Sequence, residues 1–291
     1  MILHSSRNAI IAAALFALSL TAAQSVRGQS QQQPAQQQTP PAKSGQAPAA
    51  QPGQQAPAEV PKVDPAEEKA YKAFFDSNTP QQIDAQIKLG EDFVAKYPQS
   101  KYLEVVYARL MQDYFKKQQL DKMFAAGDKA LALNPDDVDA LVLEGWVIPH
   151  NIDPNSMDTE PRLNKAEAYE KHALEIIPNV PKPANMTDDQ FAKAKDDHLS
   201  QAHSGLGLID FRRQDFAASV TELAQAEKLA AEPDPTDFYV MGIELQALKR
   251  FGDATDAFQK CAQIPGGLAD RCKQKADETK KQAAAQPAPP K

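Results

Sequence analysis

The sequence is poor in cysteine and aromatic residues and has no excess of positive charge. Only 2 of its 291 residues are cysteine and 1 is tryptophan, and the formal net charge is −7. A nucleic-acid-binding surface needs a stripe of basic residues, and charges of mixed sign in an acidic chain argue against one. After residue 20, no run is apolar over the ~20 residues that a transmembrane helix needs. We therefore expect neither nucleic-acid binding nor a membrane-spanning body.

Motifs of metal binding and catalysis are also missing. There is no HExxH, no paired CxxC, no GxSxG and no SxxK, and "GLG" at 205–207 lacks the third glycine of a dinucleotide-binding loop. His198 and His203 are five residues apart, whereas two ligands on one helix face are four apart. These two, with His150 and His172, are expected on helix surfaces or in packing. The sequence therefore predicts no enzyme, no metal site and no cofactor.

The first 23 residues have the layout of a secretory signal peptide. One positive charge, Arg7, precedes the apolar run at 9–20, and small residues follow it. Because the run is shorter than a transmembrane span, we expect cleavage after Ala23 and export. The alternative is an uncleaved N-terminal membrane anchor, and contact with a membrane is expected only in that case.

Low-complexity segments flank the body of the chain. Residues 24–63 are rich in Gln and Pro, and between 29 and 58 there is no aromatic residue and no Leu, Ile or Val. Such a segment cannot bury enough apolar surface to offset the entropy of ordering, which predicts a disordered linker. Residues 282–291 have a similar composition and are predicted to be a disordered tail. The folded body is therefore expected over 64–281.

The body contains a repeated pattern of large and small residues. In the stretch 250–261 they share one helix face, at spacings of three and four residues. These residues are Phe251, Ala254, Phe258 and Cys261. A shift of 35 residues places the pattern on an upstream copy, Phe216, Ser219, Leu223 and Ala226. Further copies lie around Met111 and Gly145, the latter with a nine-residue insertion within 150–162, and bulky Phe74 occupies the small site of a degenerate first copy.

These residues resemble the tetratricopeptide repeat (TPR), a helix–turn–helix unit of about 34 residues. The resemblance rests on Leu206-Gly207, on RFGDATDAF at 250–258 and on the endings ALALNPDD and ALEIIP. It covers roughly 66–265 and implies an all-α fold, a right-handed α-solenoid of antiparallel helix pairs. One pair cannot bury its apolar face alone, so neighbouring pairs must stack. A polar-faced helix over 266–281 is predicted to cap the stack.

The TPR resemblance also implies that the first helix of each repeat lines a concave groove for a protein or peptide partner. Repeat phase places ten residues in this groove: Arg109, Gln112, Lys116, Trp146, Gln201, Ser204, Leu208, Arg212, Tyr239 and Ile243. The Lys/Asn/Arg set that clamps a C-terminal carboxylate in some family members is not matched at the equivalent sites, which hold Ala108, Gln112, Leu143 and Gln201. Trp146 has two interpretations, a binding anchor or a core residue beside the insertion.

The two cysteines, Cys261 and Cys272, each lie about one helical turn from Pro265-Gly266-Gly267. Two helices that reverse at this turn bring the cysteines opposite each other, and export favours a disulfide between them. The alternative is two separate buried thiols.

The sequence favours a non-enzymatic scaffold that binds a protein or peptide. FVAKYPQSKYLE at 93–104 is similar to the repeat linkers of bacterial envelope-assembly TPR proteins, which implies a periplasmic setting. The alternative function is a structural subunit that self-associates, as a homo-oligomer, or spaces the layers of the envelope.

Overall fold

The computed structural model describes residues 64–77 and 79–285, and within them the chain forms eleven α-helices, two short 3-10 helices and no strand. The predicted signal peptide, the linker up to residue 63 and the end of the tail lie outside the described residues. None of the described helices combines the length and the apolar character needed to cross a membrane. The elements in chain order are α1 (Pro65–Asp76), η3 (Pro80–Gln82), α2 (Ile83–Lys96), α3 (Leu103–Lys116), α4 (Leu120–Leu133), α5 (Val138–His150), α6 (Thr159–Ile176), η4 (Ile177–Asn179), α7 (Asp188–Arg212), α8 (Phe216–Leu229), α9 (Pro235–Ala247), α10 (Phe251–Gln263) and α11 (Ala269–Ala285).

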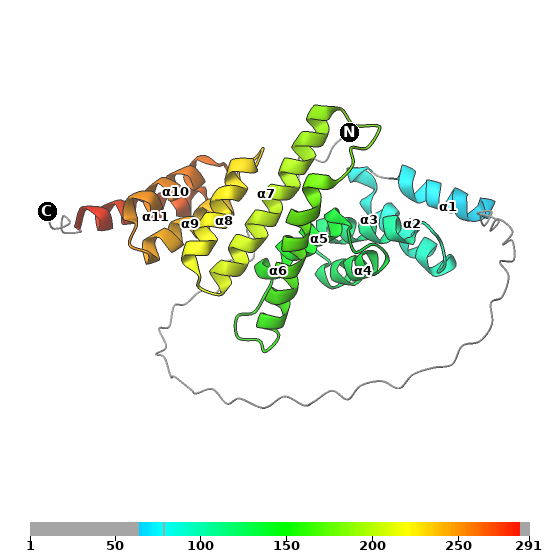
Figure 1. The fold of residues 1–291 in the computed structure, drawn as a ribbon, viewed down its shortest axis with the longest axis horizontal. Coiled ribbons are helices and arrows are strands. Elements are labelled where there is room, and N and C mark those ends of the chain that lie inside the picture. The colour runs from blue at the N-terminus through cyan, green and yellow to red at the C-terminus, as the bar shows by residue number, and fades with distance from the viewer. Residues whose placement is uncertain (1–63, 78, 286–291) are drawn as a thin grey trace, which may run out of the picture.

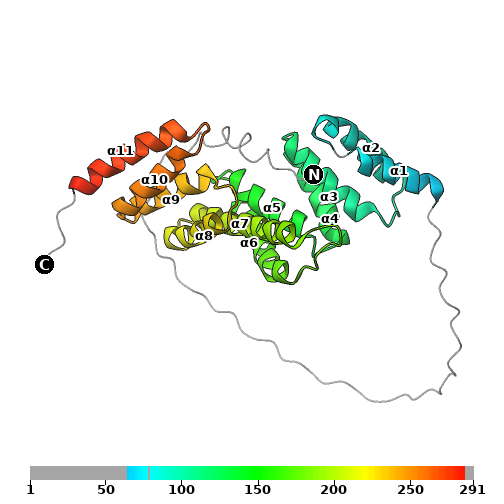
Figure 2. The same cartoon turned by 90° about the horizontal axis from the view of Figure 1, so that it is seen from above.

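Consecutive helices pack as antiparallel pairs, and the pairs stack in a row from α1/α2 to α9/α10, with α11 after the last pair (Figure 1). Seen from above, the row bends into an arc whose two ends lie on the same side of its middle (Figure 2). The all-α solenoid of TPR-like helix pairs predicted from the sequence is therefore confirmed.

Local signals in the sequence set the helix boundaries. Thr187 and Gln190 form the capping box that opens α7, each side chain accepting a backbone N–H of the other residue. At the start of α5, α8 and α9, an aspartate side chain caps the helix by accepting one backbone N–H hydrogen bond. These residues are Asp137, Asp215 and Asp234.

In each helix pair, one glycine lies against a large side chain of the other helix. An added Cβ at Gly242 would lie 2.5 Å from the Phe258 ring, and one at Gly207 would lie 2.6 Å from Leu223. The five pairs are Phe74 with Gly90, Met111 with Gly127, Gly145 with Glu170, Gly207 with Leu223, and Gly242 with Phe258. In the first two repeats the glycine is on the second helix, so bulky Phe74 at the small site of the first helix is offset by Gly90.

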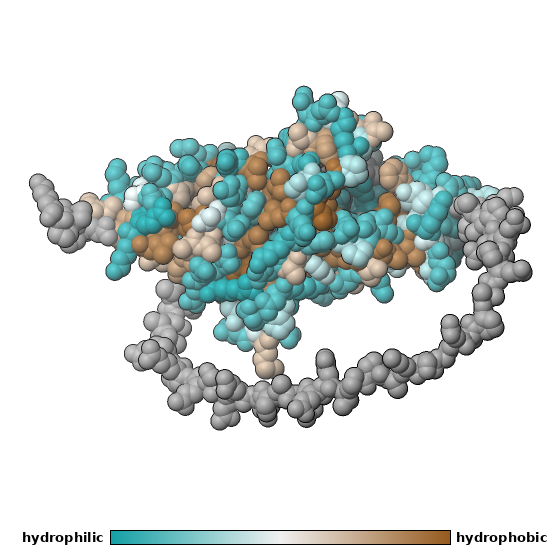
Figure 3. Space-filling view, viewed as in Figure 1, coloured by the Kyte–Doolittle hydropathy of each residue, from teal (hydrophilic) through white to brown (hydrophobic). Residues whose placement is uncertain are grey.

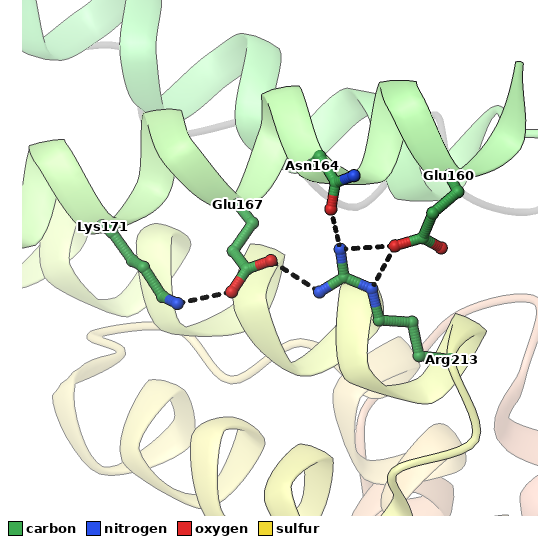
Figure 4. A network of polar contacts seen from close by, with 5 residues as sticks. All are labelled: Glu160, Asn164, Glu167, Lys171 and Arg213. Carbon is green, nitrogen blue, oxygen red and sulfur yellow. Dashed lines mark hydrogen bonds and ion pairs between the residues drawn. The ribbon is translucent and has the colours of Figure 1, made fainter. Parts of the chain in front are cut away.

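The insertion in the third repeat lengthens α6, which has 18 residues where α4 and α8 have 14. Arg213, at the end of α7, holds this longer helix (Figure 4). Its guanidinium nitrogens lie 2.9 Å from Glu160 and 2.6 Å from Glu167, and one donates to Asn164 at 2.7 Å. The insertion is thereby tied to the next repeat.

Helix α11 packs against α10 and α9 of the last pair. The Cα atoms of Cys261 and Cys272 lie 5.8 Å apart and their sulfur atoms 1.92 Å apart. Gln246 of α9 donates to Thr279 and Gln282 at 2.6 and 3.2 Å. The helix continues through residues 282–285, which we had expected in the tail, because Gln and Ala there favour helix.

Candidate partner-binding face

The first helices of the repeats, α3, α5, α7 and α9, carry the ten residues predicted to line a groove. We call their shared side the A-face. The structure buries four of the ten, Trp146, Ser204, Leu208 and Tyr239. The other six are half-buried: Arg109, Gln112, Lys116, Gln201, Arg212 and Ile243. The four buried side chains therefore offer little surface to a partner, and the half-buried ones offer more.

A polar chain through Trp146 crosses three helices of the A-face. Its indole N–H donates to the Ser204 hydroxyl at 3.2 Å, and that hydroxyl donates to Asp237 at 2.9 Å. Phe115 packs edge-on against the indole, with ring centroids 6.2 Å apart. Trp146 is only 7% exposed. In this structure Trp146 lies in the packing between α5 and α7, which is the second of the two interpretations that its sequence position allows.

A cluster of polar side chains lies on the A-face where α3, α5 and α7 meet. Asp139 of α5 and His198 of α7 form a 2.8 Å ion pair, with side chains 51% and 32% exposed. Surrounding protein desolvates Asp139, but His198, with Arg109 and Gln112, outweighs this effect and lowers the pKa of the carboxyl. Desolvation likewise acts on His198, whose pKa is raised because Asp139 stabilises its charged form.

Beside Asp139, the Asp137 side chain forms a hydrogen bond with Glu104 of α3. Burial, together with the hydrogen bond to Glu104, raises the pKa of Asp137 to about 7 against the lowering effect of the Ala140 N–H. Polar groups of three successive repeats therefore converge here. We call Glu104, Arg109, Gln112, Asp137, Asp139 and His198 together the α3–α5–α7 cluster.

A second polar group lies at the C-terminal end of α5. Arg212 of α7 donates through Nε to the Pro149 carbonyl at 2.9 Å. His150 donates from Nδ1 to the Trp146 carbonyl at 2.7 Å, because a carbonyl oxygen can only accept. The His150 ring lies 4.0 Å from the indole ring, and burial lowers its pKa. His150 is thus a neutral side chain beside the cationic Arg212.

Several carboxyl groups are buried elsewhere between the helices, a feature that the sequence pattern did not predict. Glu144, Glu170 and Glu244 are all 0% exposed. Within 64–77 and 79–285, no group of three or more His, Cys, Asp or Glu side chains is arranged to hold a metal ion. A pocket of about 480 Å³ lies between α4 and α6 and contains none of the ten predicted residues.

The surface in the view of Figure 3 is mostly hydrophilic, with apolar residues gathered across the middle of the stack. Phe211 of α7 and Ile243 of α9 are half-buried apolar side chains that pack against the core of the last repeats.

No family model matches this chain, and no curated protein matches its sequence. Among solved structures, it is similar to a thermophilic TPR protein of Thermus thermophilus, with 15% identity and a TM-score of 0.46 over 73% of this chain and 98% of that one. It is also similar to PilW, a widely conserved type IV pilus biogenesis factor, with 18% identity and a TM-score of 0.48 over 77% and 94% of the two chains. The likeness concerns the fold; the TPR-like description rests on the repeated helix pairs themselves.

Proposed function

We propose that this protein is a non-enzymatic scaffold of the bacterial cell envelope that binds a segment of a protein partner on its A-face. The observation that carries the proposal is the α3–α5–α7 cluster, where polar side chains of three repeats converge and still reach solvent. The helices hold these donors and acceptors in place before a partner binds. Little conformational entropy of the scaffold side chains is therefore lost on binding.

The envelope setting rests on two features of the sequence and one of the structure. The signal-peptide layout of residues 1–23 directs export. The Gln/Pro-rich segment 24–63 then serves as a tether of some reach. The close approach of Cys261 and Cys272 suits an oxidising compartment, where disulfides persist.

Crosslinking in living cells tests the proposal. The native protein and a version lacking residues 29–62 are crosslinked and purified, and the proteins recovered with each are identified and quantified by mass spectrometry. We expect both to recover one other protein in a fixed ratio, because the solenoid rather than the tether makes the contact. Recovery of this chain alone, as a dimer or larger oligomer, contradicts the proposal and supports the structural, self-associating alternative. Loss of the partner on deletion of the tether contradicts the A-face as its site.

A further inference from the structure

Two neighbouring arginines at the end of α7 have opposite surroundings. Arg213 contacts Glu160, Glu167 and Asn164, so its charge is fully compensated (Figure 4). Arg212, the residue before it, is half-buried on the A-face and donates one hydrogen bond to a neutral carbonyl, that of Pro149. No carboxylate of residues 64–77 or 79–285 forms an ion pair with Arg212.

This arrangement has a cost, since burial penalises a charge that no opposite charge compensates. Burial alone lowers the pKa of Arg212, and no neighbouring anion offsets it. An apolar or amide side chain avoids this cost. The guanidinium at this position is therefore not explained by the stability of the fold.

The groups around Arg212 hold it in place without neutralising it. Its Nε satisfies one of the carbonyls left free at the C-terminus of α5. His150 is adjacent and, with a lowered pKa, is neutral at pH 7. Asp234 acts electrostatically on His150, yet its side chain is engaged with the Thr236 N–H as the cap of α9. The fork of the Arg212 guanidinium thus retains donors for an acceptor from outside.

We propose that Arg212 is an anion subsite of the A-face and binds the side-chain carboxylate of an Asp or Glu residue in the partner segment. This inference rests on the proposed function and specifies the chemistry of the partner. A carboxylate matches the planar guanidinium with two parallel hydrogen bonds. An internal side chain fits better than a chain terminus because α7 is in the middle of the stack, with α5 on one side and α9 on the other (Figure 1). A segment that crosses α7 can therefore contact the A-face on both sides of Arg212.

A peptide library with uncharged termini tests the inference, because only the side chains of its peptides can then carry charge. The probe is a bead library of random decapeptides, acetylated at the N-terminus and amidated at the C-terminus, and it is exposed to labelled protein of residues 24–291. We expect the selected peptides to be enriched in Asp and Glu. R212Q is expected to bind them at least about tenfold more weakly, the loss of a charge-assisted pair. The matched control R250Q removes a charge at an exposed pair with Asp253 and is expected to change affinity less than twofold.

A double-mutant cycle identifies the contact. Replacing the selected Glu of the peptide by Gln should weaken binding to the wild type as much as R212Q does, and should have no further effect on R212Q. Thermal unfolding serves as the folding control, and R212Q is expected to melt at or above the wild-type temperature, since it removes an uncompensated charge.

Four results overturn the inference. Selected peptides without acidic enrichment, or equal binding by R212Q and the wild type, contradict the anion subsite and leave the proposed function standing. Binding only by a parallel library with free C-termini assigns Arg212 to a chain terminus and contradicts the side-chain assignment. If neither library yields a binder, the proposed function fails, and this inference fails with it.

Discussion

Glu170 is the residue that departs most from its own repeat. By repeat phase it stands where Leu223 and Phe258 stand in the next two copies, and like them it faces a glycine, Gly145. Its side chain is 0% exposed, and neither carboxyl oxygen has a hydrogen-bond partner within the described residues. Burial therefore raises its pKa well above the ordinary value, and the group is held neutral.

The substitution Glu170→Met is expected to stabilise the fold. It keeps the length of the side chain and removes a buried carboxyl without partners, a change that contributes about 1–3 kcal/mol. Chemical denaturation of the purified domain measures the free energy of unfolding. Glu175→Met, at an exposed site of the same helix, is the control and should change it by under ~0.5 kcal/mol. A less stable E170M protein contradicts this account of Glu170.

At the level of single residues, the repeat phase could predict the large and small core positions from the sequence. It could not predict which groove residues are buried. Trp146, Ser204 and Leu208 lie where α5, α7 and α9 approach one another. The sequence of a single repeat does not determine how closely its first helix packs against the first helix of the next repeat. The sequence also could not predict that Arg213 is paired with carboxylates and Arg212 is not, because the residues that contact them come from α6 and α5.

At the scale of helices, the glycines set how closely each pair packs. Gly242→Ala places a methyl group 2.5 Å from the fully buried Phe258 ring, which cannot move without disturbing the core. We expect a loss of about 1–3 kcal/mol in the free energy of unfolding. Gly252→Ala is the control, because an added Cβ there meets nothing within 4 Å, and it should be neutral or stabilising by up to ~1 kcal/mol. Equal effects of both substitutions would refute the role given to Gly242.

The cap on the last repeat is expected to depend on a disulfide. If Cys261 and Cys272 are bonded, neither thiol of the exported protein reacts with iodoacetamide after denaturation without reductant. Replacing both by Ser is then expected to cost about 2–3 kcal/mol and to speed hydrogen exchange in α11. Alkylation of both residues in the unreduced protein means instead that they are two buried thiols. Sequence spacing predicted the close approach of the two cysteines, because both flank one tight turn.

For the whole molecule, buried acids determine the response to pH. Burial raises the pKa of Glu144 to about 7 and that of Glu244 to about 8, and Glu170 shifts in the same direction. In the unfolded chain these acids ionise above pH ~4.5, whereas in the fold Glu144 and Glu244 stay protonated up to about pH 7 and about pH 8. Between these limits unfolding releases protons, so stability falls as the pH rises from about 4.5 to about 8. Carboxyls with lowered pKa, such as Asp139, act oppositely: their stabilisation is lost as pH falls towards their folded pKa.

The melting temperature is therefore expected to be highest near pH 5 and to fall by several degrees towards pH 8.5. Calorimetry across this range at constant ionic strength makes the measurement. E170M should show a smaller fall than the wild type, since it lacks one of the groups that titrate. A melting temperature that rises from pH 5 to 8.5 contradicts the assignment of these acids as neutral in the fold.

The central claim is that the A-face contacts the partner, and photocrosslinking from single positions tests it most directly. A photoreactive amino acid is placed at half-buried Gln201 on the A-face and, as control, at exposed Asp121 on α4. In living cells we predict a crosslink to another protein from position 201 and none from position 121. A crosslink to that protein from 121 but not from 201 would contradict the account, as would crosslinks from 201 to this chain alone.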